Sequence, residues 1–366
     1  MKVKTTQKGI GRKILLIFAG VSILAIAALA VVAALQSSGA LNDAAAQQLE
    51  SIRTIKANQI AGYFDGAKVD TEVIANAGDT RRAVVEFVRY HEEMDIRADE
   101  RYDTTGSGDF LTRTWDEIYA EVDEQLRIYV DEMGYYDVFI ICYPHGHVMY
   151  THAQEADLGT NLLHGEYQDS GLAEVWAAAR ESDQPVLVDM SPYAPSNNAP
   201  AMFAGQLLRN DDGSPAAVIA VQLSNDQINA VMQERTGLGE TGETYVVGED
   251  FLMRSDSFLD SANRSVEASL NGTVSQNGVD TEATRQAFAG NPATRVITDY
   301  NGNPVLSSWS TIDLGAFDWA VLAEIDQAEV NAPVRALILS IAVVSVVILA
   351  VIVIVALLFA RTISRP

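Results

Sequence analysis

Cysteine and proline are scarce in this sequence of 366 residues. Cys142 is the only cysteine, so a disulfide within the chain is impossible. It lies in the apolar segment FIICY, which favours a buried small hydrophobic side chain over a reactive thiol. The region from 36 to 335 must therefore depend on apolar packing for its stability, and its length is sufficient for two modules with cores of their own.

Basic residues are also scarce in this region. The formal net charge of the chain is −24, from 25 basic and 49 acidic residues. Seven of the basic residues and none of the acidic ones lie outside 36–335, which leaves 18 basic against 49 acidic residues inside it. Lys56 and Lys68 are the only lysines there. Because such an acidic surface repels nucleic acid and anionic lipid, we expect no nucleic-acid partner.

Charge is absent altogether from two long apolar runs, Ile14–Leu35 and Ala336–Ala360. Each exceeds the roughly 20 residues that a helix needs to cross a bilayer, so both are predicted to span a membrane and contact its lipid. Basic residues precede the first run and follow the second. Since basic flanks stay in the cytoplasm, we expect both termini inside and residues 36–335 on the periplasmic or extracellular side of the inner membrane. A cleaved signal peptide is the alternative for the first run, but the run is longer than a usual signal-peptide core.

Motifs of catalysis are lacking as well. Neither G-x-S-x-G nor H-E-x-x-H occurs, and we expect no enzymatic activity. Gly237, Gly239 and Gly242 match the dinucleotide pattern G-x-G-x-x-G, but a predicted helix precedes them and a predicted strand follows, which reverses the order that such a site requires. We interpret these glycines as a helix terminator and a tight turn.

Three histidines, His145, His147 and His152, fall in or beside a predicted hairpin. His145 lies in the turn, and the other two are an odd number of residues apart, so they face opposite sides of a regular strand. A metal site needs converging ligands, and only His164 or a carboxylate would complete one here. We therefore interpret the three as surface histidines and expect neither a metal nor a cofactor.

The residues that follow the first apolar run indicate helix. Apolar side chains recur at near-helical spacing, and no proline occurs before Pro144, which predicts one long helix from Ala40 to about His91. Such a helix suits a dimer seam, so a homodimer is expected. Gly62, Gly66 and Gly78 are predicted to mark bends in this helix. A second amphipathic helix is predicted from Trp115 to near Gly134.

Beyond position 135 the sequence becomes rich in β-branched and aromatic residues. Two cycles of hairpin, helix and further strands predict an α+β fold of two similar modules. The first cycle comprises strands Tyr136–Tyr143, His147–Thr151, Pro185–Met190, Ala201–Leu208 and Ala216–Leu223 with a helix over Glu174–Arg180. The second comprises helices Asn225–Arg235 and Ala283–Ala289, the hairpin of Glu243–Gly248 with Phe251–Ser255, and strands Thr294–Tyr300, Pro304–Ser310 and Phe317–Ile325.

Several segments resemble a double Cache sensor domain, the tandem PAS-like modules outside the membrane in bacterial receptors. They are YDVFIICYPHGHVMY (Tyr136–Tyr150), Asp157–Ala173, DMSPYAPSNNAPAMFA (Asp189–Ala204), Gly237–Ser255 and Asp299–Trp309. The resemblance implies two tandem PAS-like (Cache) modules on a long N-terminal helix, flanked by two transmembrane helices.

The final residues, RTISRP, resemble the start of a HAMP linker. This implies the front half of a methyl-accepting chemotaxis protein, whose missing cytoplasmic region would contact chemotaxis signalling proteins. A histidine kinase or nucleotide cyclase with the same sensor part is the alternative. The expected divisions are a cytoplasmic N-terminus 1–13, spans 14–35 and 336–360, a sensor domain 36–335 with a helical part 40–135, a membrane-distal module 136–224 and a membrane-proximal module 225–330, and a HAMP-like linker 361–366.

Asp189 is the strongest candidate ligand-binding residue. It ends an apolar strand before a loop rich in aromatic residues and proline, where a carboxylate at the rim of a pocket would attract a cation. In double Cache receptors of amines and amino acids a comparable Asp binds the ligand ammonium. The alternative is that Asp189 caps the following turn. The resemblance implies a small-molecule ligand in the distal module, bound by Asp189, Tyr193, Phe203, Tyr167, Asp137, Phe139 and Tyr150.

The resemblance is incomplete at one point. Amino-acid-binding members carry an R-x-W-Y cluster that clamps the ligand carboxylate. No such cluster occurs between Asp157 and Trp176, and Arg180 is the only arginine nearby. An amine, a carboxylate or a less common ligand are therefore the alternatives to an α-amino acid.

Overall fold

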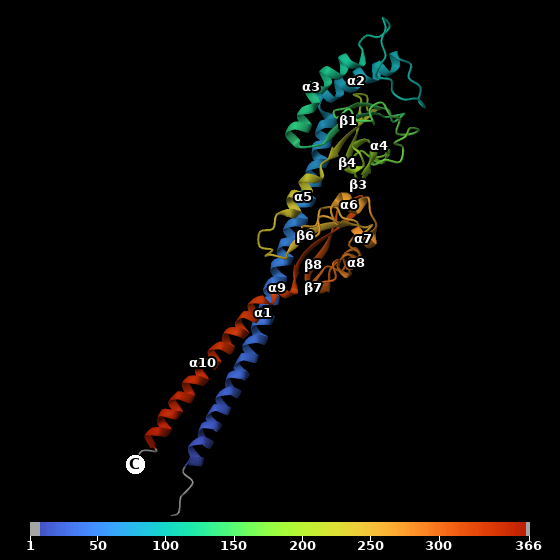
Figure 1. Ribbon diagram of the computed structural model, residues 1–366. Helices are drawn as coiled ribbons and strands as arrows, with labels where there is room; N and C mark the ends of the chain where they lie inside the picture. Colours follow the sequence, from blue (N-terminus) through green and yellow to red (C-terminus); the bar gives the residue numbers. More distant parts are fainter. Residues whose placement is uncertain (1–7, 364–366) are drawn as a thin grey trace, which may run out of the picture.

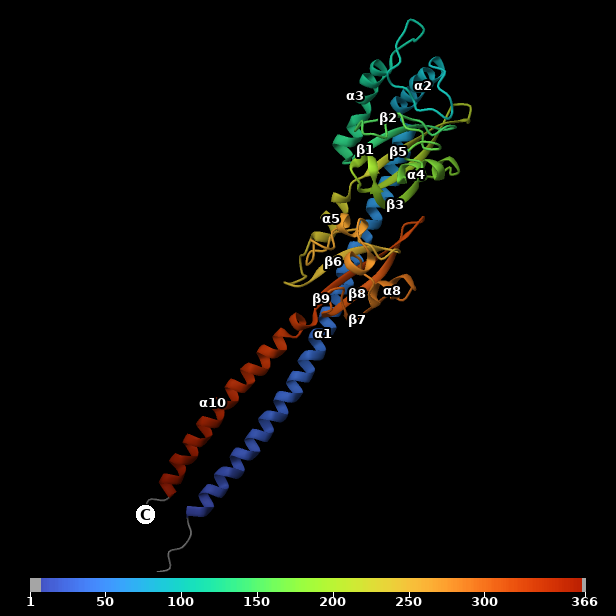
Figure 2. The same ribbon diagram turned by 45° about the vertical axis from the view of Figure 1, so that its right-hand side comes forward.

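The computed structural model describes residues 8–363. The predicted cytoplasmic N-terminus and HAMP-like linker thus lie partly outside the described residues. One helix, α1 (Lys8–Asn76), runs from the lower end of the molecule past both modules (Figure 1). The last helix, α10 (Ala332–Ile363), returns beside its lower part, so the start of α1 and the end of α10 lie at the same end of the molecule (Figures 1 and 2).

Two helical segments, Gly20–Asn76 and Gln327–Val355, are long and apolar enough to cross a membrane. The start of the first segment and the middle of the second border one space, which small and branched side chains line: Ile23, Ala27, Ala30, Ile338, Ile341 and Ala342. The length and composition of these helices agree with the two predicted spans.

The long helix passes Gly62 and Gly66 without a break and ends at Asn76. Ala77 has an extended backbone, and α2 (Gly78–Glu93) follows it, so only Gly78 among the three predicted bends lies at an interruption. Helix α3 (Trp115–Met133) begins with a capping box between Thr114 and Glu117 and ends on Gly134 at φ +77°. This end agrees with the predicted boundary, because glycine adopts the left-handed conformation at low cost.

The distal module contains a five-stranded antiparallel sheet in the order β2-β1-β5-β4-β3. Its α2/α3 side joins the larger apolar core with the upper part of α1, and α4 covers the other face. The elements are β1 (Asp137–Cys142), β2 (Val148–Thr151), α4 (Gly171–Arg180), β3 (Val186–Tyr193), the short helix η1 (Ala194–Ser196), β4 (Ala199–Arg209) and β5 (Pro215–Leu223).

Helix α5 (Asn225–Gln233) leads into the proximal module, whose four-stranded antiparallel sheet has the order β6-β9-β8-β7. The strand predicted at Phe251–Ser255 is reduced to one bridge between Val247 and Met253. Two short helices, α6 and α7, were not predicted. The elements are β6 (Glu243–Gly248), α6 (Val266–Leu270), α7 (Val274–Asn277), α8 (Glu282–Phe288), β7 (Ala293–Thr298), β8 (Pro304–Asp313), β9 (Asp318–Asp326) and α9 (Gln327–Val330). The predicted α+β class with two tandem modules on one long helix is thereby confirmed.

Candidate functional site

An aromatic cluster covers the α4 side of the distal sheet. Phe139 of β1, Tyr193 of β3 and Phe203 of β4 are fully buried there. The rings of Tyr193 and Phe203 are 5.0 Å apart and those of Phe139 and Phe203 are 6.1 Å apart, both edge to face. Three of the predicted ligand-binding residues are thus brought together. Tyr167 lies at the margin of the same cluster and is only partly buried.

A polar cluster lies at the end of this face, where β1 begins. Asp137 is the first residue of β1 and lies opposite Gln222 of β5. Its carboxylate accepts hydrogen bonds from the backbone N–H groups of His152 (2.7 Å) and Ala153 (3.2 Å) and from the Thr151 hydroxyl. These donors come from the end of β2 and the residues after it, so Asp137 fastens the first hairpin.

Asp157 is the second carboxylate of this cluster and has no exposed surface. Its Oδ2 accepts the Tyr193 hydroxyl at 2.6 Å, whereas its Oδ1 has no hydrogen-bond partner. Gln222 is also buried, and its Oε1 has no partner either. Glu155 stands beside them and accepts the hydroxyl of Ser196 at 2.5 Å. The cluster therefore presents acceptors in excess of its donors.

The ionisable groups of the cluster are acidic, and no basic side chain in the described part of the chain pairs with them. Burial, partly offset by hydrogen bonds, raises the pKa of Asp137 to about 7 and that of Asp157 to about 6. Among residues 8–363, no ion pair joins Asp137, Glu155 or Asp157 to a basic side chain. Because buried carboxylates are normally paired, this end of the distal sheet is suited to a group that carries positive charge.

A groove of about 320 Å³ opens beside this cluster, between the two modules. Ser196 and Gln222 contribute to its distal wall, and Asp256 and Glu267 to its proximal wall. Asp256 is held in place, because its Oδ1 accepts the Val266 N–H at 2.7 Å. The groove volume is at the lower end of the range typical of small-molecule sites.

Asp189 lies outside this cluster, at the contact between the modules. Its carboxylate accepts hydrogen bonds from Arg254 (Nη2, 2.7 Å; Nε, 3.1 Å) and from the Trp319 indole (2.8 Å). Arg254 is 3% exposed and is also paired with Asp250. The sequence predicted that Asp189 would bind the positive charge of a ligand. In the structure, Arg254 of the proximal module supplies that charge instead. Asp189 also accepts the N–H of Met190 at 2.7 Å.

Tyr150 lies on the opposite face of the distal sheet. Its hydroxyl donates to Asp123 of α3 at 2.9 Å, and its ring lies 6.0 Å from that of Phe87 in α2. We therefore leave Asp189 and Tyr150 out of the proposed ligand set. Sequence reasoning missed Glu155 and Asp157, which lie in the connection between β2 and α4, and Gln222 of β5. Their shared location depends on the pairing of β1 with β5, which places Asp137 opposite Gln222 and which the sequence does not state.

The proximal module repeats the arrangement around Asp137. Glu243 is the first residue of β6 and lies opposite Glu324 of β9. Its Oε2 accepts the Ser257 hydroxyl at 2.8 Å and the N–H groups of Phe258 and Leu259 at 3.0 and 3.2 Å. A hydroxyl and two successive N–H groups thus hold the first carboxylate of each module, although the two sequences are not a repeat.

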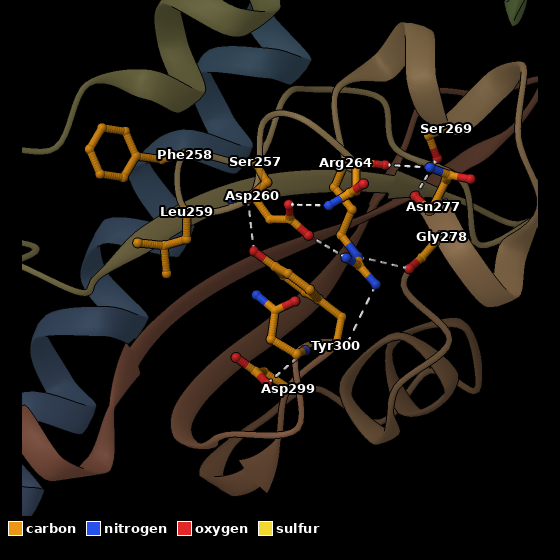
Figure 3. Close-up of polar contacts among 12 residues, drawn as sticks. Ser257, Phe258, Leu259, Asp260, Arg264, Ser269, Asn277, Gly278, Asp299 and Tyr300 are labelled. Atoms are coloured by element: carbon orange, nitrogen blue, oxygen red, sulfur yellow. Dashed lines mark hydrogen bonds and ion pairs between the residues drawn. The ribbon is translucent and has the colours of Figure 1, made fainter.

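The proximal cluster differs in that a cation stands next to it. Arg264 pairs with Asp260, donates to the carbonyl of Gly278 and lies 4.5 Å over the ring of Tyr300 (Figure 3). Tyr300 in turn donates to Glu243. Burial raises the pKa of Glu324 to about 7, and its Oε2 accepts the Tyr245 hydroxyl at 2.8 Å. A local positive charge therefore distinguishes this module from the distal one.

The glycines that match the dinucleotide pattern form a turn between α5 and β6. Gly237 and Gly239 have positive φ angles of +86° and +70°. A β-carbon on Gly242 would lie 2.0 Å from the Leu238 carbonyl oxygen. The turn binds Glu329 of α9, whose carboxylate accepts the N–H groups of Glu240 and Thr241 at 2.8 Å each. The turn that these glycines shape is thus hydrogen-bonded to α9, which leads into α10.

No protein-family model matches the sequence. The protein named Probable chemoreceptor y4sI, from Sinorhizobium fredii (strain NBRC 101917 / NGR234), is 20% identical over 256 residues, which cover 70% of this chain and 31% of the relative. The chain therefore spans about a third of the length of the curated relative it matches.

Several solved structures are also similar to the chain. The ligand-binding domain of Campylobacter jejuni chemoreceptor Tlp3 in complex with 4-methylisoleucine has a TM-score of 0.49 at 11% identity, covering 80% of this chain and 95% of that one. The ligand-binding domain of Pseudomonas aeruginosa PAO1 chemoreceptor PctB in complex with L-Gln has a TM-score of 0.47 at 13% identity, covering 78% and 92%. The chain is thus similar to chemoreceptor sensor domains, as its sequence predicted, and the ligands named belong to those proteins.

Proposed function

We propose that this chain is the sensor part of a transmembrane chemoreceptor and that its distal module binds a small cationic amine outside the membrane. The observation that carries the proposal is the polar cluster of Asp137, Glu155, Asp157 and Gln222. It holds three carboxylates without an ion-pair partner among the described residues and two buried oxygens without a hydrogen bond. An ammonium group supplies both the missing charge and the missing donors.

The groove beside the cluster favours a ligand with two positive charges. Asp226, Asp256 and Glu267 line the groove itself. The carboxylates of the polar cluster lie behind its distal wall, where the Ser196 hydroxyl donates to Glu155. A short diamine has one ammonium for the distal carboxylates and one for the proximal wall. Its binding would contact both modules at once, so its affinity would depend on how they are arranged.

The proposed signal leaves through the proximal module. Arg254 and Trp319 tie that module to Asp189 of the distal sheet. The proximal module is in turn bonded to α9 through Glu329 and to α1 through Arg53, whose guanidinium donates to the Trp309 carbonyl at 2.9 Å. A ligand that shifts the modules would thereby shift α10 against α1. The proposal includes a cytoplasmic region that receives this signal and the chemotaxis proteins that this region contacts.

A stripe on α1 supports the proposed homodimer. Ile55, Val69 and Val73 are more than half exposed, and nothing lies within 4 Å of a β-carbon built on Gly62 or Gly66. Their spacings of three, four and seven residues place all five on one side of the helix. Glycines at such positions allow two helices to approach closely. We define these five residues as the α1 stripe.

Replacing Val69 by lysine is expected to weaken the homodimer by more than about tenfold, because a twofold seam brings two like charges together. Analytical ultracentrifugation of the full chain in detergent measures the dissociation constant. Val85→Lys is the matched control, since Val85 is equally exposed but lies on α2 outside the stripe. Equal dissociation constants for wild type and Val69→Lys would exclude the stripe as the seam.

The ligand class is tested by a thermal-shift screen of the full chain. The panel compares 1,4-diaminobutane with 1,4-butanediol, its uncharged counterpart, and with succinate and L-serine. We expect only 1,4-diaminobutane to raise the unfolding midpoint. At a hundredfold excess over its dissociation constant, it should increase the free energy of unfolding by about 2.7 kcal/mol. Stabilisation by succinate, or by the diol as much as by the diamine, would contradict a cationic ligand.

A further inference from the structure

Four potential metal ligands converge at the outer edge of the distal module. His91 lies near the end of α2, Cys142 ends β1, His145 lies in the β1–β2 turn, and His147 precedes β2. One ligand atom from each lies within 4.8 Å of the other three. Two of the three histidines interpreted from the sequence as surface residues, His145 and His147, are thus half-buried or buried members of a cluster. The two residues that complete it, His91 and Cys142, were not expected there.

The separations within the cluster suit a tetrahedral ion. His91 Nε2 and His147 Nδ1 are 3.1 Å apart, and Cys142 Sγ is 3.9 Å from His145 Nδ1. From the usual zinc–nitrogen and zinc–sulfur bond lengths, two nitrogens on one Zn²⁺ are about 3.3 Å apart and a sulfur and a nitrogen about 3.6 Å. Small side-chain shifts therefore suffice to bring the donors onto one centre.

The surrounding backbone orients two of the donors. His147 Nε2 lies 2.9 Å from the carbonyl oxygen of Glu100, which places the ring N–H on that side and leaves the Nδ1 lone pair facing His91. A carbonyl in this position is the usual support for a metal-binding imidazole. The turn is fixed as well, because Cys142 N–H donates to the His147 carbonyl at 2.8 Å and Gly146 N–H to the Cys142 carbonyl at 3.1 Å.

We propose that His91, Cys142, His145 and His147 bind one Zn²⁺ ion. Three imidazoles and one thiolate supply four nitrogen and sulfur donors, the donor types and the number that a tetrahedral Zn²⁺ takes, and none of the four is needed for the ligand cluster. Cys142 and His147 are buried while His91 and His145 are partly exposed, so the ion has an approach from solvent. The site would cross-link α2 to the first hairpin in a chain that cannot form a disulfide.

The test uses the full chain in detergent, stripped of metal and then titrated with zinc chloride against a chromogenic chelator. We expect one Zn²⁺ per chain and an increase in the unfolding midpoint. Cobalt(II) in place of zinc should give the intense visible bands of a tetrahedral site and a thiolate charge-transfer band. Cys142→Ser should remove the charge-transfer band, and His145→Gln should weaken zinc binding by more than about a hundredfold, since even supporting residues contribute about 10- to 100-fold.

His152→Gln and His164→Gln are the matched controls, because these two histidines lie outside the cluster. His145→Gln changes only a partly exposed turn residue and should fold without metal. Absence of stoichiometric zinc binding to the wild type, an octahedral cobalt spectrum, or undiminished binding by both His145→Gln and Cys142→Ser would overturn the proposal.

Discussion

Replacing Asp189 by alanine is expected to lower the free energy of unfolding by about 3 kcal/mol. The substitution removes the carboxylate that pairs with Arg254, a side chain 3% exposed, and leaves the Trp319 indole N–H without its acceptor. Removing one partner of a buried ion pair costs about 3–5 kcal/mol. We expect a value at the lower end of this range, because the Asp189 side chain is 27% exposed and Arg254 keeps its ion pair with Asp250.

Chemical denaturation of the full chain in detergent measures this change. Asp183→Ala is the matched control, because Asp183 pairs with Arg209 on the surface and exposed pairs contribute about 0–1 kcal/mol. Affinity for 1,4-diaminobutane should stay within about threefold of wild type, since Asp189 is outside the proposed ligand set. A loss of affinity without a loss of stability would instead return Asp189 to the ligand site that the sequence suggested.

Replacing Asp157 by asparagine is expected to weaken diamine binding by about a hundredfold, or about 2.7 kcal/mol. Asparagine keeps an oxygen for the Tyr193 hydroxyl but removes the charge, and loss of one partner of a buried charge pair costs about 2–5 kcal/mol in binding. The fold should be retained, because the substitution has almost the same shape.

Asp169→Asn is the control for this second prediction. Asp169 is exposed and lies in the same connection between β2 and α4, so it tests whether any negative charge nearby has the same effect. Calorimetry on both variants gives the dissociation constants. An unchanged constant for Asp157→Asn, or equal losses for the two variants, would remove Asp157 from the site.

Much of the fold was predictable, because local pattern decides it. The strands around Phe139, Val218 and Val321 are runs of β-branched and aromatic residues, and Gly134 ends α3 where a helix terminator was expected. Helices α6 and α7 were missed because four or five residues are too few for a periodic signal. The second hairpin shrank to one bridge where Phe251 adopts a φ of +61°.

The candidate site was predictable only in part. Asp137, Tyr193 and Phe203 carry a local signal, since each lies at the end or inside face of a strand. The roles of Asp189 and His91 depend on partners 65 and 56 residues away, Arg254 and His147. A single sequence does not state which distant residues are in contact. The Asp189 carboxylate was therefore predicted to be available for a ligand, although Arg254 binds it in the structure.

Calorimetric titration of 1,4-diaminobutane into the wild-type chain at pH 5 and pH 8 tests the proposed ligand site most directly. With pKa values raised by burial to about 7 and about 6, Asp137 and Asp157 are largely protonated at pH 5 and ionised at pH 8, while the diamine is cationic at both. Affinity should therefore rise by at least about tenfold from pH 5 to pH 8, as expected when a group of pKa about 6 must lose its proton. No binding at pH 8, or the same affinity at both pH values, would contradict a cationic ligand held by these carboxylates.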